Sequence, residues 1–205
     1  MLIVFEGIDT CGKTTQIEML KNSFCDESKM MNGLAPVFTK EPGSNTTIGK
    51  ELRDILLNNS ELSDNARVFL FLADRAEHYS QIVNPALNRK RTVISDRSFI
   101  SGMAYQKMDW NSAMHMNLSA MSGTLPNVVF MLKIPKEEYI KRISAKKSDA
   151  LEDSIGIDGM MSHQNRLEEA LSFVKDKFGV NYFILDGMKK EADIHKEIMD
   201  ILRKI

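Results

Sequence analysis

The sequence predicts an α/β fold in which a five-stranded parallel sheet lies between two layers of helices. Five short apolar runs recur along the chain, at residues 2–5, 35–38, 92–95, 128–134 and 182–185. Segments with helical spacing of apolar residues separate these runs, and such an alternation favours parallel strands joined by right-handed crossovers. Because no internal repeat or linker marks a boundary in the sequence, residues 1–205 are expected to form a single domain.

The first half of the chain provides two strand–helix pairs and a third helix. The apolar run at 2–5 leads through a glycine-bearing turn into an amphipathic stretch at 14–24. The second run stops at the Glu-Pro-Gly turn of residues 41–43, and apolar residues then recur at helical spacing over 48–56. Residues 65–80 are apolar on most sides without Gly or Pro, which predicts a buried helix.

The second half continues the alternation. Pro135 follows the fourth apolar run and suits the first turn of a helix, which is predicted at 136–144. The polar stretch 145–158 breaks the periodicity. A helix is predicted at 160–178, and after the last strand a closing helix carries apolar residues through 194–202.

Composition excludes several classes of protein. The chain has 27 Lys and Arg against 28 Asp and Glu, a balance that argues against a protein that coats nucleic acid. Its apolar runs are far shorter than the roughly 18–20 residues that span a bilayer, and it shows no signal peptide. Two cysteines, Cys11 and Cys25, give no zinc spacing or disulfide framework. A cytoplasmic protein with neither nucleic acid nor membrane as partner is expected.

Residues 7–14 (GIDTCGKT) fit the pattern G-x-x-x-x-G-K-[ST] between a predicted strand and a predicted helix. In such a loop, backbone N–H groups and the helix N-terminus surround phosphate groups. Lys13 is expected to reach the outer phosphates, and the Thr14 hydroxyl to ligate Mg²⁺. The residues predicted to bind ATP are Gly7, Ile8, Asp9, Thr10, Cys11, Gly12, Lys13, Thr14 and Thr15.

Two carboxylates accompany this loop. Asp96 ends the third strand, where an acid can hold Mg²⁺ through water; an ordinary ion pair with Arg97 is the alternative. Asp9 lies inside the phosphate cradle, so it needs a donor of its own, such as a sugar hydroxyl or an arginine. A loop-stabilising Asx-turn is the alternative for Asp9. Cys11 is interpreted as a small filler without a catalytic role.

The loop pattern alone fits switch GTPases, ATP-driven motors and small-molecule kinases. Other residues favour a kinase. Arg53 lies on one predicted helix, Phe71 and Arg75 lie four residues apart on one face of the next, and Arg97 follows the strand acid. One aromatic ring and three arginines suit the binding of a base and a phosphate.

Longer motifs resemble those of the thymidylate kinase family, of the bacterial type, within the P-loop nucleoside monophosphate kinases. The matching segments are residues 5–9 with 12–16 (FEGID, GKTTQ), 39–43 (TKEPG), 70–76 (LFLADRA), 94–97 (ISDR) and 104–106 (AYQ). The resemblance implies a three-layer P-loop kinase fold with a short mobile lid at about 144–158. It also implies transfer of the γ-phosphoryl group of ATP to dTMP, giving dTDP and ADP in dTTP biosynthesis, by a cytoplasmic, Mg²⁺-dependent homodimer.

The same resemblance implies roles for individual residues. Arg53 and Arg97 would bind the dTMP phosphate, Phe71 would stack on thymine and Arg75 would contact the base. Tyr105 would crowd the 2′ position of the sugar, and Asp9 would accept from its 3′-hydroxyl. The full substrate-binding set is Asp9, Pro42, Arg53, Phe71, Arg75, Arg97, Ser101, Tyr105 and Gln106, with Thr14 and Asp96 as the residues for Mg²⁺.

The phosphate loop of this chain lacks a cation that some family members carry, so the catalytic cations are expected elsewhere. Some members carry an arginine in the phosphate loop, but here positions 9–11 are Asp-Thr-Cys. The charge of the transferring phosphoryl group should then be met from the lid. The predicted catalytic residues are Lys13, Arg97, Asp9, Arg142, Lys146 and Lys147. A solvated helix end is the alternative for the two lysines.

Further departures are Lys40 where arginine is common, Ser98 where tyrosine is common and Gly102 where serine is often found. Two other functions stay open at this stage. One is a kinase of the same scaffold that acts on a different nucleotide or a deoxynucleoside. The other is a nucleotide-dependent binding module or switch, which would hydrolyse slowly and phosphorylate no acceptor.

Overall fold

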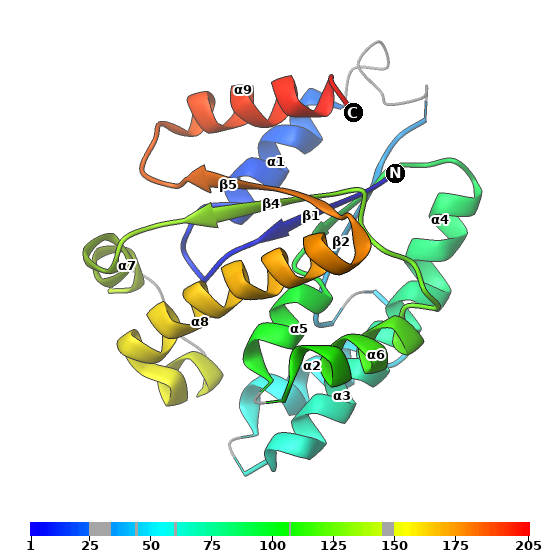
Figure 1. The fold of residues 1–205 in the computed structure, drawn as a ribbon, viewed down its shortest axis with the longest axis vertical. Helices are drawn as coiled ribbons and strands as arrows, with labels where there is room; N and C mark the ends of the chain where they lie inside the picture. Colours follow the sequence, from blue (N-terminus) through cyan, green and yellow to red (C-terminus); the bar gives the residue numbers. More distant parts are fainter. Residues whose placement is uncertain (25–33, 44, 60, 107, 145–149) are drawn as a thin grey trace.

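The computed structural model describes residues 1–24, 34–43, 45–59, 61–106, 108–144 and 150–205. Its centre is a sheet of five strands: β1 (Leu2–Glu6), β2 (Val37–Lys40), β3 (Val93–Asp96), β4 (Val128–Lys133) and β5 (Asn181–Asp186). The strands lie in the order β2-β3-β1-β4-β5, and every pair is parallel. The predicted fold class, with its five parallel strands and covering helices, is confirmed (Figure 1).

The strand order determines where a ligand can bind. From β1 the chain crosses to the edge strand β2 and returns to β3, whereas β4 and β5 extend the sheet on the other side of β1. In the register of β1 with β3, Phe5 lies opposite Asp96, so both strands end at the same level. Open parallel sheets bind ligands outside the carboxyl ends of strands where the order reverses. The loops after β1 and β3 meet at that place.

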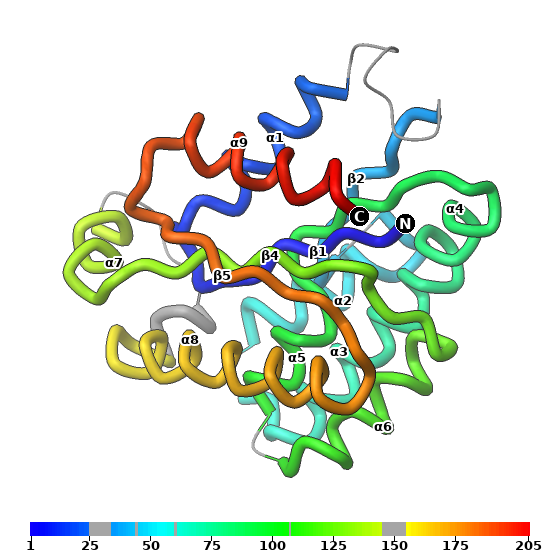
Figure 2. Tube along the Cα trace, turned by 45° about the horizontal axis from the view of Figure 1, so that its top comes forward, coloured from blue at the N-terminus to red at the C-terminus, as the bar shows by residue number. Residues whose placement is uncertain are grey.

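Helices cover both faces of the sheet (Figures 1 and 2). One face carries α1 (Lys13–Ser23) and α9 (Glu191–Leu202), which pack on each other. The other helices are α2 (Gly49–Asn58), α3 (Asp64–His78), α4 (Asn84–Asn88), α5 (Phe99–Tyr105), α6 (Trp110–Ala120), α7 (Lys136–Ile143) and α8 (Ala150–Phe178). The long α8 crosses the opposite face and contacts α5.

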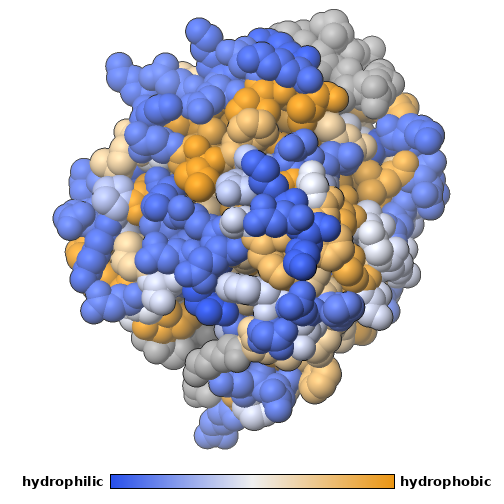
Figure 3. Space-filling view, in the orientation of Figure 1, coloured by the Kyte–Doolittle hydropathy of each residue, from blue (hydrophilic) through white to orange (hydrophobic). Residues whose placement is uncertain are grey.

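Side chains of the central strands alternate between two buried clusters, one on each face of the sheet. Leu2 and Val4 of β1 join the cluster under α5 and α8, whereas Ile3 and Phe5 join the cluster under α1 and α9. Burial on both sides explains why β1 and β4 read as continuous apolar runs. Outside the core, polar residues cover much of the face in Figure 3, with smaller hydrophobic areas between them.

Three predicted boundaries are wrong. Strand β2 begins at Val37 rather than at residue 35. The third helix ends at His78 and continues into a π-helical turn, Tyr79–Val83, and α4. Helix α8 begins at Ala150, so residues 150–158 are helical where a break was expected; the break is confined to Gly156, whose φ of 68° favours glycine.

Helices α4, α5 and α6 were not predicted. Helix α5 has seven residues, of which six are buried. It therefore has no polar face from which helical periodicity could be recognised in the sequence. Among the residues described, no helix combines the length and the apolar character that a membrane span requires.

Candidate active site

The loop between β1 and α1 has the backbone of a phosphate cradle. Gly7 has φ 135° and Gly12 φ 109°, a region that favours glycine. A Cβ on Gly7 would lie 2.5 Å from the Leu132 carbonyl oxygen, so the close approach of the loop to β4 also requires glycine. The Lys13 ammonium is buried and donates to the carbonyls of Gly7 and Ile8, each at 3.0 Å. The loop therefore wraps around its own lysine.

Arg97 ties the loop to the end of β3. Its guanidinium donates to Asp9 Oδ1 at 2.8 Å, to the Gly7 carbonyl at 2.9 Å and to the Ser101 hydroxyl at 3.1 Å. Burial disfavours its charge, but the Asp9 carboxylate and the nearby Tyr105 and Glu6 outweigh this and raise the pKa of Arg97. Arg97 is thus a fixed cation, and the arginine partner that Asp9 was expected to need is present.

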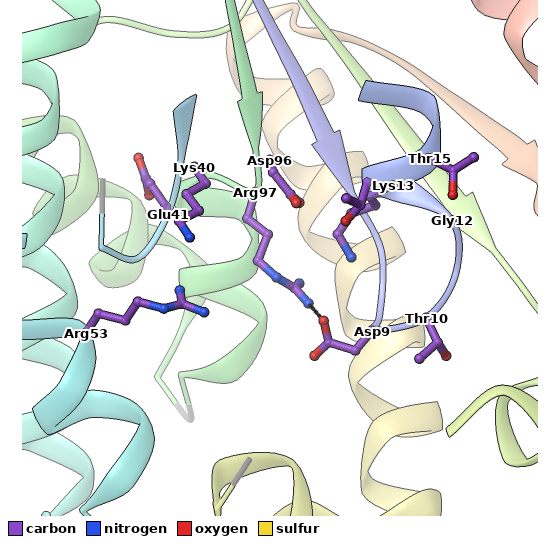
Figure 4. Close-up of a pocket in the computed structure, with 11 residues that line it drawn as sticks. Asp9, Thr10, Gly12, Lys13, Thr15, Lys40, Glu41, Arg53, Asp96 and Arg97 are labelled. Atoms are coloured by element: carbon purple, nitrogen blue, oxygen red, sulfur yellow. Dashed lines mark hydrogen bonds and ion pairs between the residues drawn. The ribbon is translucent and has the colours of Figure 1, made fainter. Parts of the chain in front are cut away.

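A cavity of about 340 Å³ opens beside this pair. Figure 4 shows Arg53, Arg97 and Lys13 reaching into it from three different segments. Its lining residues are Asp9, Thr10, Gly12, Lys13, Thr14, Thr15, Lys40, Glu41, Arg53, Asp96 and Arg97. Of the predicted ATP-binding residues, Gly7, Ile8 and Cys11 belong to the loop but do not line the cavity. The structure therefore brings the phosphate loop, the strand acid and two of the three arginines into one space.

Arg53 is oriented by the Glu-Pro-Gly turn. Its Nη1 donates to the Pro42 carbonyl at 2.7 Å. Gly43 has φ 79°, and a Cβ there would lie 2.5 Å from Arg53 Cδ. The turn is held in place by Asp74 of α3, whose two carboxylate oxygens accept from the Gly43 N–H at 3.1 Å each. Pro42 itself does not line the cavity but fixes an arginine that does.

Arg75 lies in a buried polar network. It donates to Glu41 Oε2 through Nε at 2.9 Å and Nη2 at 2.8 Å, and to Asn117 Oδ1 at 2.6 Å. His78 bonds to the other Glu41 oxygen at 2.9 Å. Burial disfavours the charge of Glu41, but Arg75 and His78 outweigh it and lower the pKa of this carboxyl. Gly102 leaves room for the guanidinium, because a Cβ there would lie 3.1 Å from Arg75 Nη2.

A second, smaller cavity of about 60 Å³ lies between α3 and α5. It brings together three predicted substrate-binding residues, Phe71, Tyr105 and Gln106, and Gly102 also lines it. Both amide atoms of Gln106 are buried without a hydrogen-bond partner among the described residues. A buried amide without a partner is costly, so this cavity suits a ligand with polar groups.

Ser101 links Arg97 to the end of β1. Its hydroxyl accepts from Arg97 and donates to Glu6 Oε2 at 2.6 Å, and Ser98 donates to Glu6 Oε1 at 2.8 Å. Burial raises the pKa of Glu6, against the opposing effect of Arg97 and the two serines. Ser98 also accepts from the Ile100 N–H and so begins α5 as its N-cap. The residue that departs from the common tyrosine thus has a structural role of its own.

The predicted lid residues are only partly described. Arg142 donates to Glu138 at 2.7 Å, to the Thr10 carbonyl at 3.1 Å and to the Gly187 carbonyl at 3.0 Å. It therefore joins α7, the phosphate loop and the turn after β5. Lys146 and Lys147 lie outside the described residues.

Thr14 and Asp96 offer oxygen ligands at the same cavity. Asp96 Oδ1 is buried and accepts no hydrogen bond from the described residues. Hard oxygen donors of this kind fit Mg²⁺, which uses one or two carboxylates together with substrate phosphates and water. Within the described part of the chain no cluster of three or more His, Cys, Asp or Glu side chains forms an all-protein metal site.

Comparisons with known proteins agree with this geometry. The family model described as thymidylate kinase matches residues 5–198. The thymidylate kinase of Helicobacter pylori strain HPAG1 is 41% identical over 198 residues, covering 97% of this chain and 96% of the relative. That of Campylobacter jejuni strain 81-176 is 38% identical over 205 residues, with 99% and 100% covered. The chain belongs to the thymidylate kinase family.

A solved structure supports the fold of this thymidylate kinase family member. The crystal structure of thymidylate kinase from Ehrlichia chaffeensis superposes with a TM-score of 0.74 and covers 99% of this chain and 98% of that one. At 24% identity, this likeness speaks for the fold alone. The predicted membership in the family is confirmed by the family model and the two bacterial relatives.

Several residues of the site were not among the predicted site residues. Lys40 and Glu41 line the larger cavity and Arg67 lines the smaller one. His78 and Asn117 hold the Glu41–Arg75 pair from α3 and α6. The spacing of Arg75 and His78, three residues apart on one helix, was the available signal for a shared partner. Asn117 gave no signal, because α6 was not predicted.

Proposed function

We propose that this member of the thymidylate kinase family transfers the γ-phosphoryl group of ATP to dTMP, giving dTDP and ADP. The observation that carries the proposal is a single cavity that holds the phosphate loop on one side and Arg53 and Arg97 on the other. Phosphoryl transfer needs little covalent chemistry from the protein and depends on positioning and electrostatic stabilisation. Two phosphate-binding centres that share one cavity meet this need.

The donor side consists of the loop and its lysine. On ATP binding, the Lys13 ammonium would exchange the carbonyls of Gly7 and Ile8 for phosphate oxygens. Loop N–H groups and the N-terminus of α1 would surround the same phosphates. Thr14 and Asp96 would hold Mg²⁺, which would neutralise part of the phosphate charge.

The acceptor side would hold dTMP through its phosphate, base and sugar. Arg53 and Arg97 would bind the phosphate, since both are preoriented by carbonyl and carboxylate partners. Phe71 would stack on thymine and Arg75 would contact the base. The buried amide of Gln106 would form hydrogen bonds with the nucleoside. Asp9 would accept from the sugar 3′-hydroxyl.

Lid cations would complete the site. Arg142 uses three of its five guanidinium N–H groups to donate to Glu138, Thr10 and Gly187. These bonds support a role for Arg142 in holding the outer edge of the phosphate loop. Arg142 would therefore contribute charge at the loop, and Lys146 and Lys147 would reach the γ-phosphate from the lid at 144–158. In a Lys146→Ala, Lys147→Ala double variant, kcat should fall with dTMP affinity nearly kept; an unchanged kcat would remove these lysines from the mechanism.

We also propose that the enzyme is a homodimer. Helix α3 presents Phe69, Leu72, Ala73 and Ala76 along one face, and Phe69 is 62% exposed. These residues are apolar and two are small, so an equivalent helix of a second copy can approach closely. Light scattering should report a dimer for the wild type and a monomer for Phe69→Asp, with Phe178→Asp as the control on exposed surface. A monomeric wild type would contradict this.

The reaction is tested by ADP release from Mg-ATP with dTMP, dUMP and the other nucleoside monophosphates as acceptors. Strong stimulation by dTMP, with dUMP well behind, is expected. Lys13→Ala should abolish it, whereas Lys21→Ala, on an exposed turn of the same helix, should not. Stimulation by another monophosphate would replace the acceptor, and slow release indifferent to all acceptors would favour a nucleotide-dependent switch. We propose a cytoplasmic location for this enzyme as well.

A further inference from the structure

Helix α8 supports the part of α5 that carries Tyr105. The His163 imidazole lies face to face with the Tyr105 ring, with centroids 3.6 Å apart and planes 22° apart. His163 is 4% exposed, so the contact is closed to solvent. One turn further along the same face of α8, Arg166 donates to the Ala104 carbonyl at 2.9 Å and the Gln106 carbonyl at 2.8 Å.

These contacts fix both the backbone and the side chain of Tyr105. Carbonyls at the end of a helix lack partners within it, and Arg166 supplies them for α5. Arg166 is itself held over the Trp110 ring, 4.7 Å from its centroid. The backbone around Tyr105 is therefore anchored by Arg166, and the His163 imidazole supports one face of the phenol ring.

The imidazole is neutral at physiological pH. Burial, with the nearby positive charge of Arg97, lowers the pKa of His163 to about 3. The His163 ring therefore stays uncharged where it stacks on Tyr105 at physiological pH. Its Nε2 has no hydrogen-bond partner among the described residues, whereas a hydrogen bond between the imidazole and the Ala104 backbone helps to hold the ring against Tyr105.

We propose that His163 is a positioning residue that sets the preference of the enzyme for deoxyribose over ribose by holding the Tyr105 ring against the 2′ position of the acceptor sugar. The inference rests on the proposed function, in which Tyr105 crowds that position. Steric rejection of one hydroxyl needs a wall that cannot move aside. A tyrosine stacked on a buried planar ring and braced by Arg166 meets that condition.

Two substitutions of His163 test whether Tyr105 needs a flat ring against it or only a buried side chain that fills the space. His163→Leu fills the space without a flat face, and His163→Phe keeps a flat face. The readout is the ratio of kcat/KM for dTMP to kcat/KM for thymine ribonucleoside 5′-monophosphate. The Leu variant should lower this ratio by about tenfold and the Phe variant should keep it within about twofold. General damage to the fold would lower both kcat/KM values together and leave the ratio unchanged. His115→Leu, on an exposed position of α6, is the matched control.

The role of His163 would be overturned if His163→Leu had the same kcat/KM ratio as the wild type. It would also be overturned if His163→Phe lowered that ratio as much as His163→Leu. In a Tyr105→Ala background, His163→Leu should change the ratio no further; additive losses would also overturn it. If a variant does not fold, nuclear Overhauser contacts between the two rings in the wild-type chain decide, and their absence would overturn the stack. A wild type that phosphorylates neither acceptor would contradict the proposed function itself.

Discussion

Replacing Glu41 by glutamine should lower the free energy of unfolding and weaken dTMP binding, but leave ATP binding nearly unchanged. Both carboxylate oxygens are used, Oε2 by Arg75 and Oε1 by His78. An amide offers only one acceptor oxygen. His78 can meet the new NH2 group by changing its tautomer, but no rearrangement replaces the negative charge that faces Arg75, whose side chain is 2% exposed.

The magnitude follows from this burial. Removing one partner of a buried ion pair costs about 3–5 kcal/mol, because it leaves the other charge uncompensated. The free energy of unfolding of Glu41→Gln, from urea denaturation at pH 7.5, should fall by about that amount. A loosened Arg75 should raise KM for dTMP by about tenfold, equal to about 1.4 kcal/mol, with KM for ATP nearly unchanged.

The pH dependence provides an internal check. The pKa of Glu41 is lower in the folded than in the unfolded chain, so its stabilisation is present above the unfolded pKa and is lost as pH falls through the folded one. The wild type and Glu41→Gln should therefore converge in stability only in strong acid. Glu18→Gln, at an exposed pair with Lys21, should change little. A loss at pH 7.5 no larger than that of Glu18→Gln would refute the reasoning.

Three further outcomes are expected. Arg97→Lys should raise KM for dTMP far more than for ATP, since a point charge cannot serve Asp9, Gly7 and Ser101 at once; equal increases would contradict the acceptor-side assignment. Gly102→Ala should weaken dTMP binding by pressing on Arg75, checked by calorimetric titration, and unchanged affinity would show that the guanidinium can move aside. The pKa of His163 is about 3 in the folded chain and 6.5 in the unfolded chain, so the wild type loses stability as pH falls below 6.5. Between pH 7.5 and 5.5 this part of the loss in the free energy of unfolding is about 1.4 kcal/mol, and it should be absent from His163→Phe in urea denaturation. An equal loss in both proteins would contradict the lowered pKa.

The sequence predicted the parts of the fold in which local pattern and burial agree. β1 and β4 are buried on both faces, so each was predicted within one residue, and the apolar stripe of α9 marked this helix and its end at Leu202, although it begins three residues earlier than predicted, at Glu191. Helix α5 could not be found in this way, because nearly all of its residues are buried. The start of α8 was missed because its first turns are polar, and Gly156 reads as the end of a helix rather than as a break within one.

The site shows the same division. The phosphate loop has a spacing that its mechanism requires, so its residues could be listed before the structure was known. Arg53 and Arg97 could be proposed as cations, but not the carbonyls that orient them, since Pro42 and Gly7 act there through backbone atoms. His163 and Arg166 come from a helix some sixty residues beyond Tyr105, and contacts at that separation follow from packing rather than from any local pattern.

The central claim is most directly tested by identifying the product that forms from ATP labelled in its γ-phosphate and unlabelled dTMP. The account predicts that the label appears in the outer phosphate of dTDP, in equal amount to ADP, and that Lys13→Ala forms none. Release of the label as inorganic phosphate, with dTMP unchanged, would contradict it.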